Sequence, residues 1–380
     1  MNLTNPAKPR VLLGMSGGVD SSVAAYLLKE QGYEVVGVTM KVWPQDCVSR
    51  AEDKCCGPQA VADARGVAHQ LEIPHYVVDE AADFERMVID YFTAEYKQGR
   101  TPNPCVMCNE KLKFGAMRDK AKALGADLIA TGHYARIEQT ANGPMLKKAV
   151  DAKKDQSYFL FSLKPEQLAS SLTPLGALTK PEVRGIAQKL GLRVYDKEES
   201  QEICFVPGND YTGFLKSHMG EKEFHPGGIF DKAGKRIGDH KGIEFYTVGQ
   251  RKGLGGGHGR PIYVIDIDAA TQSVIVGDEE DLSRPDCYIR QTSWVGGEPS
   301  GPIEITTKIR YNYPELKARL HPLPGQRARL EFLEPQKAVS PGQAAVCYQG
   351  DVVLGGGWIE RTELPLPVDK LTTETTAAAI

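Results

Sequence analysis

The sequence contains no apolar run that approaches the roughly 18 residues needed to cross a membrane as a helix. Its first ten residues, MNLTNPAKPR, lack the apolar core of a secretory signal peptide. A strong charge of one sign is also missing, because the formal net charge is only -3. These absences exclude a helical membrane protein and predict a cytoplasmic protein with no membrane partner. They do not exclude nucleic acid, because its binding depends on local basic patches.

No disulfide framework is expected either, although the chain has eight cysteines. A cytoplasmic compartment keeps thiols reduced, so clustered thiols indicate catalysis or metal binding. The stretch Asn-Pro-Cys-Val-Met-Cys, residues 103–108, has the spacing of half a zinc site, a redox pair or part of a cluster ligand set. The remaining cysteines outside this stretch and Cys204 are expected to be small buried hydrophobic residues: Cys47, Cys55, Cys56, Cys287 and Cys347.

The pattern of the chain predicts three parts. Strand-like and helix-like segments alternate over the first 200 residues, which is typical of a Rossmann-like α/β fold with helices on both faces of a parallel sheet. After Cys204 glycine and proline become frequent and helical periodicity fades, and from about residue 285 short alternating strands predict an antiparallel β-barrel. We therefore expect a first domain over 1–205, a small central domain over 206–284, a barrel over 285–368 and a disordered tail over 369–380.

A glycine-rich loop, GMSGGVDSS, follows the first expected strand and opens the first expected helix, which Asp20 is expected to cap. A helix N-terminus at the carboxyl end of a parallel strand favours a phosphate, and Gly17 and Gly18 let the backbone approach it. The loop matches neither G-x-x-x-x-G-K-[ST] nor G-x-G-x-x-G, and no lysine follows its glycines. The alternative is a plain strand-to-helix turn.

A basic segment lies in residues 301–330, which contain six basic residues and only two acidic ones, Glu304 and Glu315. Such a segment is typical either of a solvated barrel surface or of a surface that meets phosphates. The basic residues are Lys308, Arg310, Lys317, Arg319, Arg327 and Arg329.

The loop SGGVDS resembles the signature of the PP-loop ATP pyrophosphatases, which transfer AMP from ATP to a substrate oxygen. Seven further stretches fall in order along the chain: GRTPNPCVMCNEKLKFG, IATGHYA, KDQSYFLF, ICF, GQRKGLG, SPGQAAV and LGGGWI. Together they resemble the bacterial tRNA-specific 2-thiouridylases, from about Val11 to Val368. This resemblance implies an ATP-dependent, tRNA-binding transferase. It would adenylate the C2 oxygen of the wobble uridine (position 34) and replace it with sulfur from a cysteine persulfide.

The resemblance also implies roles for individual residues. The catalytic pair would be Cys204, which carries the persulfide, and Cys108, which can form a disulfide with it when turnover ends. ATP, with Mg²⁺ near Asp20 and Ser21, would bind Gly14, Met15, Ser16, Gly17, Gly18, Val19, Asp20, Ser21, Met40 and Gly132. The tRNA, whose target uridine must be flipped out of its stack, would meet Asn103, Pro104, Cys105, His133, Lys154, Asp155, Gln156, Arg310, Tyr311 and Gln343.

The expected partners are the tRNAs for Lys, Glu and Gln and a sulfur donor, either a cysteine desulfurase or a relay protein. Cys105 departs from the pattern, because some relatives have an aspartate there. Three thiols, Cys105, Cys108 and Cys204, are also compatible with an iron–sulfur cluster that has one open iron. A zinc site with His133 as fourth ligand is a further alternative.

Two other function classes remain open. A PP-loop amidoligase would transfer ammonia and would not need Cys108 and Cys204. A non-catalytic RNA-binding or metal-storage module would not need the glycine loop.

Overall fold

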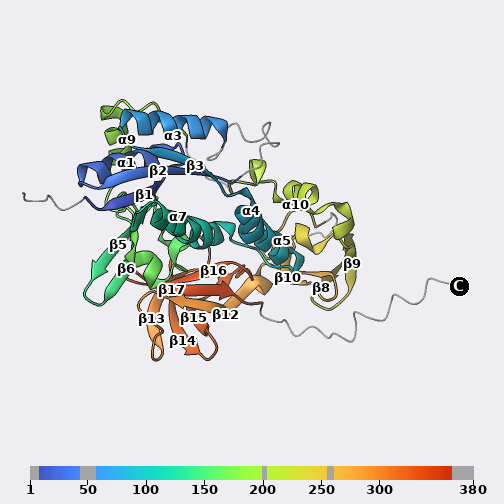
Figure 1. Ribbon diagram of the computed structural model, residues 1–380. Coiled ribbons are helices and arrows are strands. Elements are labelled where there is room, and N and C mark those ends of the chain that lie inside the picture. Colours follow the sequence, from blue (N-terminus) through green and yellow to red (C-terminus); the bar gives the residue numbers. More distant parts are fainter. Residues whose placement is uncertain (1–7, 43–56, 199–202, 255–260, 362–380) are drawn as a thin grey trace, which may run out of the picture.

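The computed structural model describes residues 8–42, 57–198, 203–254 and 261–361. These residues form a parallel sheet with helices, a small mixed sheet and an antiparallel barrel, in sequence order (Figure 1). The expected tail at 369–380 lies outside the described residues, as do Cys47, Cys55 and Cys56.

The first part is built on a parallel sheet with strand order β3-β2-β1-β4-β7. Alternate residues of β1 face opposite sides: Val11 and Leu13 pack in the cluster that contains α1, α3 and α9 residues, whereas Leu12 packs in the cluster that contains Met117 of α7. Helices therefore cover both faces (Figure 1). The strands are β1 (Arg10–Gly14), β2 (Glu34–Lys41), β3 (His75–Asp79), β4 (Leu128–Ala130) and β7 (Ser171–Leu172).

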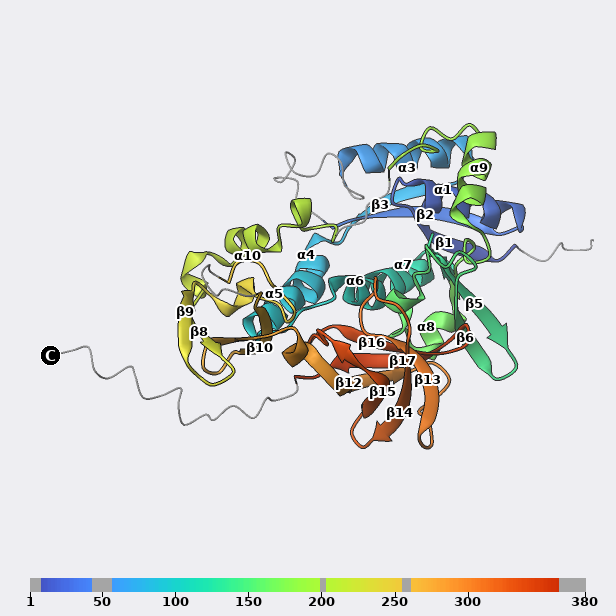
Figure 2. The same cartoon turned by 180° about the vertical axis from the view of Figure 1, so that it is seen from behind.

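Two helical stretches contain π-helical segments, which often occur at functional sites. The first runs through α4, η2 and α5, and the second through α6, η3 and α7; Figure 2 shows α6 between α5 and α7. The helices of this part are α1 (Val19–Glu30), α3 (Pro58–Gln70), α4 (Ala81–Phe84), η2 (Glu85–Ile89), α5 (Asp90–Lys97), α6 (Pro104–Met107), η3 (Cys108–Ala116), α7 (Met117–Ala123), η4 (Ser157–Leu160), α8 (Pro165–Ala169) and α9 (Lys180–Lys189).

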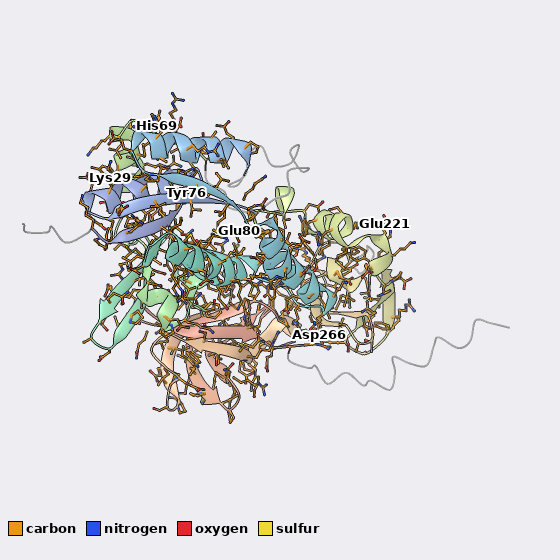
Figure 3. The ribbon with its side chains drawn as sticks, in the orientation of Figure 1. Lys29, His69, Tyr76, Glu80, Glu221 and Asp266 are labelled. Atoms are coloured by element: carbon orange, nitrogen blue, oxygen red, sulfur yellow. The ribbon has the colours of Figure 1, made fainter. Side chains whose placement is uncertain are left out.

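The central part contains a four-stranded sheet with the order β10-β11-β8-β9. The carboxylate of Asp266 on β10 is almost completely buried and binds Arg361, 2.8 Å away, so the sheet is tied to the end of the barrel (Figure 3). The elements of this part are η5 (Pro207–Asn209), α10 (Tyr211–Met219), η6 (Glu221–Glu223), β8 (Gly227–Asp231), β9 (Arg236–His240), η7 (Ile243–Phe245), β10 (Tyr263–Asp268), β11 (Ser273–Gly277) and η8 (Glu280–Leu282).

The third part is a closed antiparallel barrel, because β12 pairs with both β15 and β17. The hairpin of β5 and β6 comes from the first part of the chain and extends the barrel sheet through the pairing of Val352 with Lys147. The barrel strands are β12 (Ser283–Trp294), β13 (Ile303–Lys308), β14 (Leu316–Leu323), β15 (Arg327–Lys337), β16 (Ala344–Gln349) and β17 (Val352–Ile359); the hairpin strands are β5 (Ala135–Thr140) and β6 (Gly143–Lys148).

The predicted fold class is confirmed, with three local corrections. Asp20 does not cap the first helix; Gly18 is the N-cap, and Asp20 lies in the first turn. The sequence ADLIATGHYA at 126–135 predicts one continuous strand, but the structure contains only β4 there, and β5 begins at its last residue, Ala135. The region after Cys204 still forms one helix, α10. Among the described residues, no helix is both long and apolar enough to span a bilayer.

Candidate active site

The glycine loop lies at the carboxyl end of β1, as its sequence predicts. Gly17 has a φ of +70°, and a Cβ placed on it would lie 2.2 Å from the carbonyl oxygen of Ala60 in α3, so this position requires glycine. The hydroxyls of Ser21 and Ser22 donate to the carbonyl oxygen of Gly18, over 3.2 and 2.8 Å, and hold the start of α1. The loop therefore presents a fixed helix N-terminus at the sheet edge where ligands bind in this fold.

Asp20 points from the first turn of α1 to residues of two distant segments. Its Oδ1 accepts a hydrogen bond from the hydroxyl of Tyr134, 2.8 Å away. The ammonium of Lys180 contacts both carboxylate oxygens, at 2.7 and 2.8 Å. The Asp20 side chain keeps 32% of its surface exposed, whereas the Lys180 side chain keeps only 8%. The loop thus carries a paired but accessible carboxylate.

Gly132 and Met40 lie at the same sheet edge as the loop. A Cβ on Gly132 would lie 2.9 Å from the backbone nitrogen of Ser21, so the segment after β4 lies directly against the start of α1. Met40 is near the end of β2 and packs against the hydrophobic cluster that contains Phe84, Phe92 and Phe205. These two predicted ATP-binding residues therefore flank the loop on both neighbouring strands.

His133 lies next to Gly132, with its ring 5.8 Å from that of Phe114. Its Nδ1 is 2.8 Å from the hydroxyl of Thr131. Burial, and next the positive charge of Lys113, lower the pKa of His133 well below its ordinary value. His133 is therefore neutral at physiological pH.

The C-x-x-C segment begins a helix at the site. Asn103 caps α6 by accepting a hydrogen bond from the backbone nitrogen of Val106 at 3.4 Å, and Pro104 occupies the first turn. Cys108 is the first residue of η3 and, together with Leu112 one turn later, contacts the cluster that contains Phe205. The helix start thus fixes where the second thiol points.

Cys204, which is distant from Cys108 in the sequence, packs against the same cluster. Its neighbour Phe205 is 2% exposed and packs edge-to-face on Phe84 and Phe92, with centroid distances of 5.7 and 5.0 Å. Cys204 and Cys108 both pack against this cluster, and so does Met40. The two predicted catalytic thiols therefore share one hydrophobic environment with a residue near the carboxyl end of β2, the strand that pairs with β1.

The three thiols do not form a ready zinc site with His133. Tetrahedral zinc at about 2.3 Å from each sulfur places its ligand atoms about 3.8 Å apart. In the described parts of the chain, only one group of three or more His, Cys, Asp or Glu side chains has its ligand atoms within 4.8 Å of one another, and it consists of Glu85, Asp90 and His218. The three thiols are therefore not all this close together. This geometry argues against the zinc interpretation of Cys105, Cys108 and Cys204.

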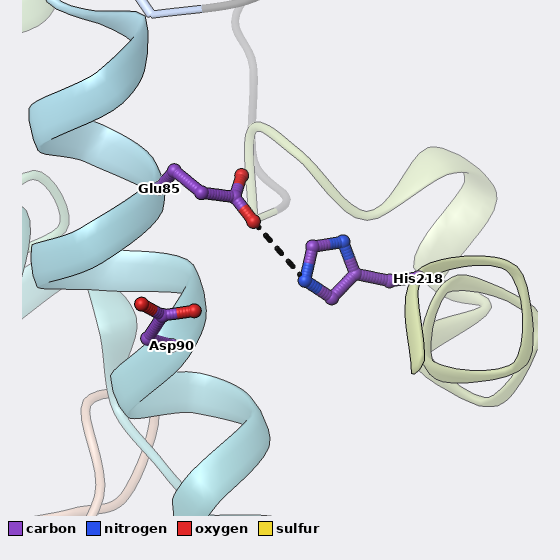
Figure 4. A group of neighbouring side chains, drawn as sticks. All are labelled: Glu85, Asp90 and His218. Atoms are coloured by element: carbon purple, nitrogen blue, oxygen red, sulfur yellow. Dashed lines mark ion pairs between the residues drawn. The ribbon is translucent and has the colours of Figure 1, made fainter. Parts of the chain in front are cut away.

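The side chains of Glu85, Asp90 and His218 form an exposed group (Figure 4). His218 Nε2 is 3.1 Å from Glu85, and the imidazole stacks on Phe214 with an interplanar angle of 9°. Exposed acidic groups often lie together without an ion, so these contacts are those of an ion pair that links α10 to η2.

The barrel contacts the backbone that precedes the first thiol. Gln343 donates to the carbonyl oxygens of Thr101 and Pro102, at 3.1 and 3.0 Å. Thr101 in turn donates from its backbone nitrogen to Pro341, at 2.8 Å. The hydroxyl of Tyr158 donates to Ala344 at 2.9 Å. The barrel therefore holds the segment that leads into Asn103 and Cys105.

Known proteins match all three parts of the chain. Family models match in order: a tRNA methyl transferase HUP domain over residues 9–208, a tRNA methyl transferase PRC-barrel domain over 212–278 and an aminomethyltransferase β-barrel domain over 284–359. A tRNA-specific 2-thiouridylase of Geotalea uraniireducens is 52% identical over 361 residues, which cover 94% of this chain and 96% of the relative. The corresponding protein of Moorella thermoacetica is 53% identical and covers 92% and 99%. The chain belongs to the tRNA-specific 2-thiouridylase family.

Several residues to which the 2-thiouridylase resemblance assigns tRNA contacts make internal contacts instead of pointing freely outward. Asp155 is 5% exposed and accepts hydrogen bonds from the backbone of Ala149 and Ser157. Gln156 accepts from the backbone nitrogen of Tyr134 at 2.9 Å. Lys154, the residue before this pair, is half-buried and donates from its backbone nitrogen to Asp151.

Arg310 and Tyr311 also face the protein. Arg310 donates to the carbonyl oxygens of Ala338 and Val248, at 2.7 and 3.4 Å, and so connects the barrel to the central part. The ring of Tyr311 lies 4.3 Å from that of Phe159. Within the basic segment, Arg319, Arg327 and Arg329 pair with acidic side chains, which lowers the net positive charge of that surface.

Three functional candidates were missed by sequence reasoning in this 2-thiouridylase. Tyr134 and Lys180 bind Asp20, and the ammonium of Lys197 lies 3.2 Å from the carbonyl oxygen of Gly17 and 2.6 Å from Asp63. The run Thr-Lys-Pro-Glu at 179–182 has the pattern of a capping box, and the structure contains that box. The sequence could therefore have located the start of α9, but not its proximity to the loop.

Proposed function

We propose that this protein synthesises 2-thiouridine in tRNA by activating the C2 oxygen of the wobble uridine with ATP and replacing it with sulfur. The observation that carries the proposal is that Cys108, Cys204 and Met40 pack against one hydrophobic cluster, and that Met40 lies near the carboxyl end of β2, beside the strand that leads into the PP-loop. Family membership supports the substrate class, because the relatives are tRNA-specific 2-thiouridylases.

The first step is adenylation. The start of α1 and the backbone of Gly17 and Gly18 hold the phosphates of ATP, since free N–H groups and the helix dipole attract an anion. The C2 oxygen attacks the α-phosphorus and pyrophosphate leaves, so a poor leaving group becomes a phosphate ester. Gly132 and Met40 lie on either side of the loop, where the rest of the nucleotide would extend.

Asp20 is the residue that would hold Mg²⁺. Magnesium in nucleotide sites takes one or two carboxylates together with phosphate oxygens, and Asp20 offers an accessible carboxylate beside the phosphate position. The ion would neutralise charge on the leaving pyrophosphate.

The second step is sulfur transfer. The terminal sulfur of a persulfide on Cys204 attacks C2 of the adenylated uridine. The thiolate of Cys108 then attacks the Cys204 sulfur; the persulfide bond breaks, AMP leaves and a Cys108–Cys204 disulfide forms. The Cys108 thiol is thus oxidised to the disulfide while the transferred sulfur is reduced. The shared packing of Cys108 and Cys204 against one cluster supports this pairing.

An iron–sulfur cluster on Cys105, Cys108 and Cys204 is a second candidate for the sulfur step. The observation that favours it is a third thiol at position 105, one turn before Cys108 at the start of the same helical stretch. The cluster would keep one iron open for sulfide. We propose the persulfide route as the first choice, because it needs only Cys108 and Cys204, which pack against the same hydrophobic cluster.

The partners follow from this chemistry. The substrates are proposed to be the tRNAs for Lys, Glu and Gln, and the sulfur donor a cysteine desulfurase or a relay protein that loads Cys204. The reaction takes place on the cytoplasmic tRNA pool.

The test is a reaction with transcript tRNA, ATP, Mg²⁺, a cysteine desulfurase with cysteine, and dithiothreitol to reduce the Cys108–Cys204 disulfide after each turnover, followed by mass spectrometry of the nucleosides. We expect one 2-thiouridine per tRNA, with AMP and pyrophosphate in equal amounts. Incorporation of ammonia in place of sulfur would support the amidoligase. Binding of tRNA without AMP formation would support a non-catalytic module.

A further inference from the structure

The glycine loop lacks the lysine of the phosphate-binding loop G-x-x-x-x-G-K-[ST]. The fold places a lysine from a distant part of the chain beside it. Lys180 lies 160 residues after Asp20 and contacts both of its carboxylate oxygens. The Lys180 side chain is 8% exposed, so its ammonium is fixed next to the phosphate position and not on the surface.

The position of Lys180 is set by its backbone. It is the first residue of α9, whose start is fixed by the capping box of Thr179 and Glu182. Its backbone nitrogen also donates to Asp151 Oδ2 at 2.9 Å. Tyr134 completes the arrangement, with its hydroxyl on Asp20 and its ring 5.7 Å from the ammonium. A mobile surface lysine would need none of these supports.

A buried ammonium is costly unless an opposite charge compensates it, and Asp20 provides that charge. The same carboxylate is the candidate ligand for the metal ion. When Asp20 binds a divalent cation, its negative charge is shared between the ion and Lys180. The polyphosphate of ATP, bound at the loop, brings new negative charge next to the ammonium, so Lys180 can form charge-assisted hydrogen bonds to phosphate oxygens.

We propose that Lys180 is the cation of the pyrophosphate site: it holds Asp20 before ATP binds, and it binds phosphate oxygens of ATP when Asp20 binds the metal ion. This inference rests on the proposed ATP-dependent function and adds a phosphate-binding residue to it. Lys180 takes the part that a loop lysine plays in other nucleotide sites, but reaches the phosphates from a different helix.

Binding of a non-hydrolysable ATP analogue, measured by calorimetry, tests the proposal without relying on turnover. With EDTA present, Asp20→Asn should bind the metal-free analogue roughly tenfold more tightly than wild type, because it frees the ammonium for phosphate. The double variant Asp20→Asn/Lys180→Gln should lose that gain. If the gain persists in the double variant, only the Asp20 charge matters and the proposal is wrong.

With Mg²⁺ present, Lys180→Gln should weaken analogue binding roughly 10- to 100-fold, and Lys180→Arg should restore most of it. Lys120→Gln is the matched control, because Lys120 also pairs with a buried carboxylate, Glu80, at 2.6 Å, but on α7 (Figure 3 labels Glu80). Lys120→Gln should bind the analogue as wild type does.

Analogue binding gives one result if the proposed function is wrong and another if only the role of Lys180 is wrong. If the wild-type protein does not bind the analogue, the proposed function itself is wrong. If the wild-type protein binds it and folded Lys180→Gln binds equally well, only the role of Lys180 is wrong. Should Lys180→Gln not fold, the comparison of Asp20→Asn with the double variant still decides, because the double variant has no unpaired buried charge.

Discussion

Gln343 of the barrel donates two hydrogen bonds, to Thr101 and Pro102, directly before the segment that carries Cys105 and Cys108. Gly342 next to it has a φ of +86°, and a Cβ there would lie 2.9 Å from both Thr101 O and Arg100 Cβ. The barrel therefore does more than offer a surface to a partner, since it fixes the backbone that places the first thiols.

This contact predicts that Gly342→Ala destabilises the protein by about 1–3 kcal/mol and lowers thiolation, because the methyl group pushes the barrel loop from the thiol segment. Gly325→Ala is the control: its φ is +78°, but its Cβ would meet nothing within 4 Å. Chemical denaturation and nucleoside analysis measure both effects. Equal losses in the two variants would show that backbone strain alone is responsible.

Asp20→Ala should abolish ATP-dependent thiolation while tRNA binding remains, because the variant removes the candidate metal ligand at the loop. The measurements are 2-thiouridine formation at saturating ATP and tRNA affinity by filter binding. Near-normal thiouridine formation would refute the assignment of the loop to the pyrophosphate.

The thiols give a prediction that separates the two sulfur routes. On the persulfide route, Cys204→Ser and Cys108→Ser should each abolish thiolation but still adenylate tRNA, whereas Cys105→Ser should keep partial activity. On the cluster route, each of the three variants should lose activity together with iron. Anaerobic preparation of Cys105→Ser, with iron analysis and a thiolation assay, distinguishes them: total loss with loss of iron contradicts the simple relay.

Arg310→Ala should lower the free energy of unfolding by about 1–3 kcal/mol, because two carbonyl oxygens, those of Ala338 and Val248, lose a charged donor. The sequence alone predicts weaker tRNA binding and a log–log salt slope flatter by roughly 0.7. From the structure we expect the slope to change less. Arg319→Ala, at an exposed ion pair, is the control for lost charge. A full change of slope with unchanged stability would restore the phosphate contact.

His133 should make stability depend on pH. Its pKa is lowered in the folded protein, so between that value and the unfolded value of about 6.5 the unfolded chain binds more protons. Stability is therefore complete above about pH 6.5 and falls as the pH drops below it. Denaturant titrations at several pH values give the slope of the unfolding free energy against pH, which measures the difference in bound protons between the unfolded and folded states. His133→Gln should reduce this difference by up to one proton. His75 and His240, whose pKa values burial also lowers, keep the remainder.

Local patterns in the sequence are enough to predict its elements and the chemistry of single segments. The apolar run Val11–Leu13 predicts a buried strand, and the glycine loop after it predicts an anion site, because both depend on neighbours in the chain. The C-x-x-C segment and Cys204 could be singled out for the same reason.

Which distant residues meet depends on the packing of the whole fold. Lys180 reaches Asp20, and Gln343 reaches Pro102, through the packing of whole helices and strands, which no local pattern records. The same packing makes Arg310, a predicted tRNA-binding residue, a donor to backbone carbonyl oxygens of the barrel and of the central part. The sequence identifies the charged side chains that need a compensating charge or a hydrogen-bond acceptor. Burial and distance in the folded protein determine whether a ligand or the protein itself provides it.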